Sequence, residues 1–351
     1  MRIGAILFRR VLGSLAIVLL AAGWAAGSAW AASDTPLRMG LPLRCDPGTS
    51  CWIVNYVDHD PGPGVRDYAC GHATYNEPST NAHSGTDFAI RDGRAMRAGV
   101  AVLAAADGTV TATRDGEADA DIKADARPVS GGKDCGNGVV IDHGNDWTTQ
   151  YCHLRKGSVA VQPRQRVRAG QSIGLVGLSG FTQFPHVHIT VRHAGTVIDP
   201  FVGLSRAVAC GVGDVPLWDT PVLARLPYQP TAIYNGGFAG EKPSPARARN
   251  GDYDVSSLDR RAAALVLWAD LFNVMKDDRI LFSIRGPDGG IIVEHADPVD
   301  KDQARRFVFA GRPLKGGEWP AGVYTGTVVV ERPNRAGPPT PQPFVVRTTL
   351  R

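Results

Sequence analysis

Short apolar runs separated by turn residues dominate the chain between residues 83 and 203. Gly or Asp bounds most of these runs, which include DFAI, NGVVIDHG, TTQYCHL, QSIGLVG and HVHITVRH. Such a pattern predicts the strands of an all-β domain. Successive strand side chains point to opposite faces of a sheet. In HVHITVRH the alternation therefore predicts one polar face made of His186, His188 and Thr190, opposite an apolar face.

Residues 216–351 continue the strand pattern with runs such as RILFSIRG, GIIVEHA, RRFVFAG, GVYTGTVVVER and PFVVRTTL. Pro-Asp-Gly-Gly at 287–290 predicts a turn between two of them. The run RRAAALVLWADLF (260–272) is compatible with a helix by its Ala and Leu content, and we favour a strand. About seven runs suit a β-sandwich of the Ig-like type. The whole chain is thus predicted to be mainly β.

The first 31 residues differ in character from the rest of the chain. Arg2, Arg9 and Arg10 lie at its start, and a long apolar run follows that ends in Ala29-Trp30-Ala31. A basic start, an apolar run and a small-residue A-x-A site predict a secretory signal peptide at 1–31, cleaved before Ala32. An uncleaved membrane anchor is the alternative. With cleavage we expect an exported protein, periplasmic or extracellular, with no stable membrane span.

Charge gives no reason to expect a nucleic-acid partner. The formal net charge is +4, and residues 1–31 contribute three Arg and no acid, so the remainder is near +1. Nucleic-acid binding needs a basic footprint, which a nearly neutral chain lacks.

Six cysteines follow the predicted signal peptide, and none of them forms a C-x-x-C pair. An even number of cysteines in an exported chain predicts disulfides. Sequence does not determine their connectivity. We favour the pairs Cys45–Cys51, Cys135–Cys152 and Cys70–Cys210, the second as a staple across a hairpin that turns near residues 144–146.

Domain boundaries follow from these patterns. Residues 32–80 are rich in Pro, Gly and Asp without helical periodicity, and they predict an irregular lead-in held by disulfides. The β domain with the histidines is expected at 81–212, and an accessory domain at 216–351. A polar stretch at 115–134 predicts a long loop within the first of these domains.

Candidate metal chemistry lies in the first β domain. His83 and Asp87 are separated by three residues just before and within a predicted strand, so both can reach one point. Two imidazoles and one carboxylate with an open position form the ligand set of a catalytic zinc. The same set serves non-haem iron oxygenases, which stay open as an alternative. His153, at the end of another predicted strand, fits better beside the metal than on it.

Three motifs together resemble those of the LytM-type M23 zinc metallopeptidases, also called the lysostaphin-like family. They are His83-x-x-x-Asp87, Tyr151-x-His153-Leu154 and His186-x-His188, and further similar stretches such as AAADGTV, GNGVVIDHG and VRAGQSIGLVGLSG occur in the same order. The resemblance covers roughly residues 80–205. It implies an antiparallel β LytM-type peptidase domain.

The resemblance also implies a role for each position. His83, Asp87 and His188 would bind one Zn²⁺ per chain. His186 would act as general base, and His153 would steady the oxyanion or share the proton transfer. Two positions depart from the family pattern: Cys152 stands where a small residue is usual, and Phe184 replaces a common Gly.

The activity implied by the resemblance is zinc-dependent hydrolysis of peptide cross-links in cell-wall peptidoglycan, with stem peptides as the partner. Two alternatives stay open within the family. One is a catalytically silent protein that binds the wall or activates an amidase, and the other is a secreted metallopeptidase that degrades proteins. The sequence does not determine the oligomeric state.

Overall fold

The structure is a computed structural model that describes residues 1, 36–77, 81–120, 132–204, 210–333, 340 and 342–351. Residues 2–31 of the predicted signal peptide lie outside the described part, as does most of the predicted loop at 115–134. Residues 35–351 form one compact unit. In the part of the chain that is described, no helix has the length and apolar character needed to cross a membrane.

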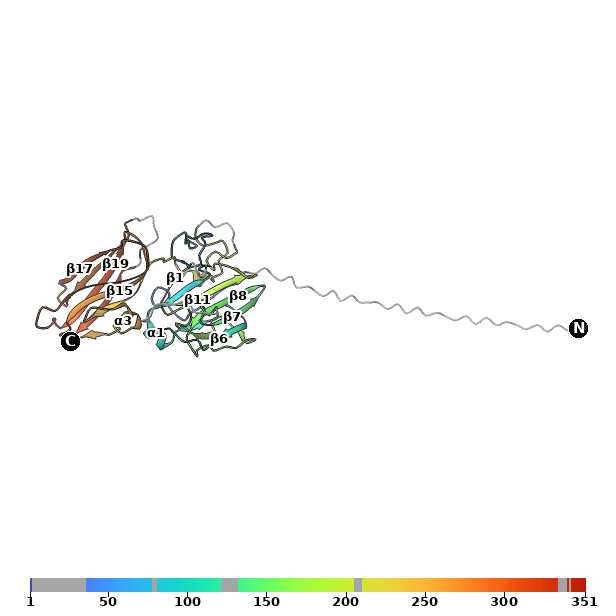
Figure 1. The fold of residues 1–351 in the computed structure, drawn as a ribbon, viewed down its shortest axis with the longest axis horizontal. Helices are drawn as coiled ribbons and strands as arrows, with labels where there is room; N and C mark the ends of the chain where they lie inside the picture. Colours follow the sequence, from blue (N-terminus) through green and yellow to red (C-terminus); the bar gives the residue numbers. More distant parts are fainter. Residues whose placement is uncertain (2–35, 78–80, 121–131, 205–209, 334–339, 341) are drawn as a thin grey trace. The chain divides into compact units, whose positions relative to one another are not determined.

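An eight-stranded antiparallel sheet forms the first half of this unit (Figure 1). In spatial order its strands are β1 (Cys51–Asn55), β4 (Thr86–Ile90), β11 (His186–His193), β8 (Trp147–Leu154), β7 (Asn137–Gly144), β6 (Gly108–Arg114) and β9 (Arg166–Val167), with β12 (Thr196–Val197) paired to β11. The order is not that of the sequence. β11 lies between β4 and β8, so the three motif-bearing segments become neighbours.

The alternation predicted for β11 is present in the structure. Val187, Ile189 and Val191 are almost fully buried and belong to the main hydrophobic core of this half. His186 and His188 of the same strand lie on the opposite face, which is the face that carries the candidate site. Burial of the apolar face therefore fixes the register, because a slip of one residue would send the histidines into the core.

Smaller elements complete this half. β2 (Asn76–Glu77) pairs with β3 (Asn81–Ala82), and β5 (Ala101–Leu103) pairs with β10 (Ser172–Leu175). The helix α1 (Gly93–Ala98) begins at Asp92, whose carboxylate accepts a hydrogen bond from the backbone N–H of Ala95 at 2.9 Å. This is the usual way to satisfy a free N–H at the start of a helix.

The segment predicted to be an irregular lead-in contributes a strand. β1 pairs with β4, with Cys51 opposite Ile90 at one end and Asn55 opposite Asp87 at the other. It forms the edge of the main sheet. Met39, Leu43 and Tyr56 of the same segment are buried in the main core. The prediction of irregular structure was wrong here, because a strand of five residues among Pro and Gly gives too little alternation to detect.

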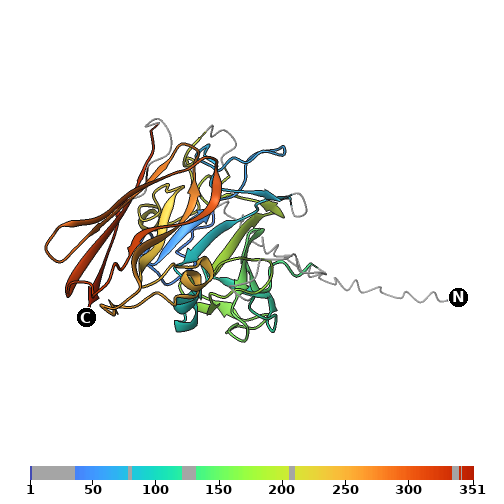
Figure 2. The same cartoon turned by 60° about the vertical axis from the view of Figure 1, so that its left-hand side comes forward.

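The C-terminal part contains two further sheets, coloured yellow to red in Figure 2. One contains β13 (Ala232–Ala239), β15 (Ala264–Val274) and β18 (Gln303–Pro313), and the other contains β14 (Ser257–Leu258), β20 (Phe344–Leu350), β19 (Gly322–Glu331), β16 (Arg279–Arg285) and β17 (Ile291–Pro298). The short helices α2 (Thr220–Leu223) and α3 (Pro245–Asn250) precede most of them. The run at 260–272, for which a helix was the alternative, contains most of the strand β15, as favoured from the sequence.

These two sheets share one hydrophobic core. Leu267 of β15 and Phe282 of β16 belong to the same buried cluster. Gly326 of β19 lies so close to β15 that an added Cβ would meet Leu267 Cδ1 at 2.7 Å. The prediction that the chain is mainly β is confirmed; the Ig-like assignment stays a prediction.

All six cysteines are paired as favoured from the sequence: Cys45–Cys51, Cys70–Cys210 and Cys135–Cys152. The Cys135–Cys152 disulfide links β8 to the residues just before β7. It therefore joins the two strands of the hairpin that turns at 144–147.

Removing the Cys70–Cys210 disulfide should destabilise the protein more than removing Cys45–Cys51. The two bonds join residues 140 and 6 positions apart, and the longer loop restricts the unfolded chain more. The chain-entropy relation gives about 5 kcal/mol for the long loop and about 2 kcal/mol for the short one. Urea unfolding of the Cys→Ser double variants measures both losses, and equal losses would contradict the expectation.

Candidate metal centre and its histidines

Three donor atoms from distant parts of the chain meet on the polar face of the main sheet. In the strand register, His188 of β11 lies opposite Asp87 of β4, and His83 lies three residues before β4 begins. His188 Nδ1 is 2.9 Å from Asp87 Oδ1, His83 Nε2 is 3.3 Å from that oxygen, and the two nitrogens are 3.1 Å apart. These residues form a group able to hold a metal ion.

Hydrogen bonds on the far side of each ring decide which nitrogen can bind a cation. His83 Nδ1 donates to the carbonyl oxygen of Tyr56 at 2.7 Å, which leaves a lone pair on Nε2. His188 Nε2 lies 2.8 Å from Thr190 Oγ1, which can accept the other ring proton. Such outer partners are the usual means of orienting metal-binding histidines.

The donor set fits zinc. With the ring protons held by Tyr56 and Thr190, two lone pairs and a carboxylate oxygen face one point, and a cation there turns their mutual repulsion into attraction. Bonds of 2.0–2.1 Å in a tetrahedron place neighbouring donors about 3.3 Å apart. The observed separations of 2.9 to 3.3 Å are close to that value.

Asp87 is held in its ionised form. Its carboxyl group is buried, which by itself raises a carboxyl pKa, but the neighbouring histidines His83 and His186 outweigh burial and hold the pKa of Asp87 well below its usual value. The second oxygen, Oδ2, accepts a hydrogen bond from Asn55 Nδ2 at 2.8 Å. Asn55 was not among the residues singled out from the sequence, since only the pairing of β1 with β4 brings it here.

His186 and His153 lie beside this group. Their ring centroids are 4.6 Å apart, and His186 Nε2 is 3.5 Å from Asp87 Oδ1. His186 Nδ1 donates to the carbonyl oxygen of Phe184 at 2.9 Å, and His153 Nδ1 donates to that of Ser179 at 2.8 Å. Both rings therefore keep Nε2 free to accept a proton. Burial, followed by the nearby His186 and His188, holds the pKa of His153 well below its usual value.

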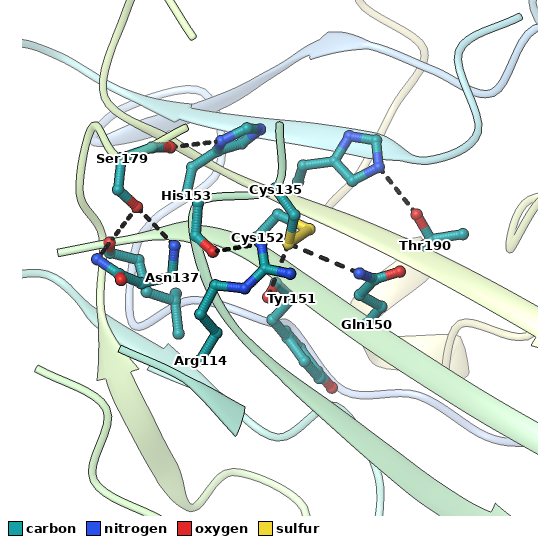
Figure 3. The surroundings of a disulfide bond; sticks show 12 residues. Arg114, Cys135, Asn137, Gln150, Tyr151, Cys152, His153, Ser179 and Thr190 are labelled. Carbon is teal, nitrogen blue, oxygen red and sulfur yellow. Dashed lines mark hydrogen bonds between the residues drawn. A yellow bond between two sulfur atoms is a disulfide. The ribbon is translucent and has the colours of Figure 1, made fainter. Parts of the chain in front are cut away.

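His153 is fixed in an uncommon backbone conformation with φ of +63°. Its N–H donates to the Cys135 carbonyl oxygen at 2.8 Å. Figure 3 shows the bond from its ring to Ser179. Ser179 and Asn137 support the same turn: Ser179 Oγ accepts from the Asn137 N–H at 2.9 Å and donates to the Leu154 carbonyl oxygen at 2.7 Å. Neither residue was singled out from the sequence, although both lie in stretches similar to those of the family.

The Cys135–Cys152 disulfide lies directly beside His153 (Figure 3). Cys152 precedes His153 in the chain, and Cys135 supplies the carbonyl oxygen just described. The unusual cysteine of the Tyr151-x-His153 motif thus anchors the strand end that carries the histidine.

A cavity of about 270 Å³ opens beside the metal group. His83, His153 and His188 lie in its wall. The remaining lining is mixed and includes Tyr75, Asp134, Gln150, Phe181, Arg192 and the Cys135–Cys152 disulfide.

Comparison with known proteins relates one segment of the chain to a known family. Residues 81–200 match the model of peptidase family M23. The resemblance found in the sequence is confirmed.

Two curated relatives are similar over part of their length. One is the peptidoglycan DD-endopeptidase ShyA of Vibrio cholerae, 39% identical over 30% of this chain and 19% of ShyA. Another is the DD-carboxypeptidase/endopeptidase Mpg of Neisseria meningitidis, 33% identical over 34% of this chain and 22% of Mpg. The chain thus spans about a fifth of the length of each. A solved zinc-containing peptidase from Vibrio cholerae is 24% identical, covering 46% of this chain and 37% of that one, with a TM-score of 0.29.

Replacing Asn55 by Ala should weaken zinc binding. The variant removes the hydrogen bond that orients Asp87, and loss of such outer partners typically costs about 10- to 100-fold in metal affinity. Competition with a chromophoric chelator measures the dissociation constant. Asn250→Ala is the control, since Asn250 belongs to α3 of the C-terminal part and its side-chain amide donates to Asp252. An affinity within twofold of the parent chain would contradict the expectation.

Zinc affinity should fall as the pH is lowered. Burial favours neutral His83, but Asp87 and the Tyr56 carbonyl outweigh it and raise the pKa of His83 above its usual 6.5. Protonated Nε2 has no lone pair, so affinity is lost as the pH falls through this raised pKa. Calorimetric titrations with zinc between pH 8 and pH 6 test this, and a constant affinity would count against it.

Proposed function

We propose that this chain is a zinc-dependent endopeptidase that hydrolyses peptide cross-links of cell-wall peptidoglycan. The observation that carries the proposal is the meeting of His83 Nε2, Asp87 Oδ1 and His188 Nδ1 within 3.3 Å, with two further imidazoles beside them. The names of the relatives ShyA and Mpg support the choice of substrate.

One zinc ion per chain would be held by His83, Asp87 and His188, with one position left over from a tetrahedral set. The chemistry that zinc supplies when bound is polarisation of the scissile carbonyl and a lowering of the pKa of the attacking water to about 7. An intact donor set supports an enzyme over a silent relative that only binds the wall.

His186 is the general base in this proposal. Its Nδ1 proton is committed to the Phe184 carbonyl oxygen, so Nε2 carries the lone pair, and that nitrogen lies 3.5 Å from Asp87 Oδ1 on the side of the metal group. Nε2 takes a proton from the attacking water and later delivers it to the nitrogen of the leaving amine.

His153 shares the proton transfer. Its single ring N–H in the neutral form is donated to the Ser179 carbonyl oxygen, so Nε2 is an acceptor rather than a donor. Of the two roles expected from the sequence, proton transfer therefore suits this geometry better than steadying an oxyanion, which requires an N–H at Nε2.

The bond cut is proposed to join two D-configured centres in a stem-peptide cross-link, such as D-alanyl–diaminopimelyl. The DD designation of both curated relatives supports this over an interpeptide glycine bridge.

An exported, periplasmic location fits the chain. Its three disulfides need an oxidising compartment. We place a signal peptide at 1–31, the lead-in at 32–80, the peptidase domain at 81–212 and an Ig-like β-sandwich at 216–351. The shared core of the two C-terminal sheets supports the last assignment.

His186→Ala and His188→Ala should fail in different ways. His186→Ala keeps all three metal donors and loses the base, so it should bind zinc and lose turnover by about 10²- to 10⁴-fold. His188→Ala should lose the zinc itself. Zinc content by mass spectrometry, with fragment release from purified sacculi, separates the two. Equal zinc content and near-parental activity in both variants would defeat the assignment.

The substrate is tested with the parent chain on sacculi and on casein, each with and without chelator. Chelator-sensitive release of peptide fragments from sacculi supports the proposal. Digestion of casein without action on sacculi would indicate a protein-degrading metallopeptidase instead.

A further inference from the structure

A residue of the C-terminal part reaches the neighbourhood of the proposed base. Arg305 of β18 places its guanidinium carbon 4.9 Å from the ring centroid of Phe184, and Phe184 lies two residues before His186. The Nη1 atom of Arg305 also donates to the Gln183 carbonyl oxygen at 3.5 Å. Two segments more than a hundred residues apart thus meet at the start of β11.

Phe184 contacts His186 in two ways. Their rings are stacked, with centroids 4.6 Å apart and planes 29° from parallel. The Phe184 carbonyl oxygen also accepts the Nδ1 proton of His186 at 2.9 Å. The tilt of the imidazole therefore depends on where residue 184 lies. The tautomer depends on the same carbonyl oxygen together with the Thr182 hydroxyl, which lies 3.1 Å from Nδ1.

Arg305 is held in place from the other side. Its guanidinium carbon is 5.3 Å from the Phe272 ring and 5.7 Å from the Tyr234 ring. Its charge is balanced by the buried carboxylate of Asp270, 3.5 Å from Nη2. Asp270 is also bound by Arg249 at 2.8 Å, so this carboxylate keeps a charged partner without Arg305.

Apolar contacts close the same region. Trp52, Val54 and Ala89 of the peptidase half form one buried cluster with Ala232, Tyr234 and Phe272 of the C-terminal sheet, and Phe184 packs against it. A cation enclosed by aromatic faces and shielded from water is held more firmly than one at the surface. The C-terminal sheet thus presents a fixed cation to the ring that supports His186.

We propose that Arg305 is a positioning residue for the peptidase reaction: it fixes Phe184, which in turn fixes the ring and tautomer of His186. The C-terminal part is then a component of the active site. The inference rests on the proposed function, in which His186 is the base. The signal for it in the sequence is Phe184, which departs from the family pattern and gives the cation an aromatic face.

The first test is Arg305→Ala, with steady-state cleavage of a purified cross-linked muropeptide dimer. A misplaced base slows the chemical step, and a shift of about 1 Å can cost as much as 100-fold. We expect kcat to fall at least tenfold, with KM and zinc content unchanged. The control is Arg306→Ala, whose side chain pairs with Asp297 and is expected to leave kcat within twofold. A parental kcat in Arg305→Ala overturns the proposal.

A double-mutant cycle tests the route through Phe184. Phe184→Leu should lower kcat by itself, and adding Arg305→Ala to it should cause no further loss. Fully additive losses would show that Arg305 acts elsewhere, and they overturn the proposal. If Arg305→Ala does not fold, Phe184→Leu decides alone: an unchanged kcat overturns the proposal, and a tenfold loss with normal zinc content supports it.

A readout independent of activity separates this inference from the proposed function. In ¹⁵N–¹H spectra of the histidine rings, the parent chain should show His186 protonated at Nδ1. Arg305→Ala should give a mixture of tautomers at His186 and leave His83 unchanged. A parent chain that cleaves no peptidoglycan refutes the function, and an unaltered His186 signal in the variant refutes the positioning.

Discussion

The mutual contact of two imidazole nitrogens and a carboxylate oxygen is the constraint on which this structure depends. Groups of this kind are costly to bury unless a cation lies between them. His83, Asp87 and His188 tolerate burial because every other polar atom of these side chains has its own partner: the Tyr56 carbonyl, the Asn55 amide and the Thr190 hydroxyl. The neighbouring strands β4, β11 and β8 carry this group on one face of the sheet. The apolar residues on the other face of the same strands form the core.

Backbone carbonyl oxygens do most of the orienting. Tyr56, Phe184 and Ser179 each accept one ring proton through the main chain. Substitution of those side chains leaves the acceptor in the chain, and only its position can change. The geometry of the site is therefore sensitive to whatever moves the backbone, including the Cys135–Cys152 disulfide beside His153 and the packing of Phe184.

The sequence predicted what depends on local pattern. Alternation located β11 and its two faces, the turn residues located the β7–β8 hairpin, and the resemblance of three motifs to a known family brought together the five candidate residues. It could not reveal Asn55, because its role depends on the pairing of β1 with β4 in a segment with little alternation. The role of Arg305 could not be predicted for a similar reason. In RRFVFAG it is an ordinary strand arginine, and only the tertiary fold places it against Phe184.

β1 lies outside the family-matched segment 81–200, yet it carries Asn55 and leads directly into Tyr56. Two of the bonds that orient the metal donors therefore come from upstream of the recognised peptidase boundaries. A fragment trimmed to those boundaries would retain every motif residue and still lose the scaffold that aims them. The part of the chain that keeps this metal group oriented is accordingly longer than the family-matched segment.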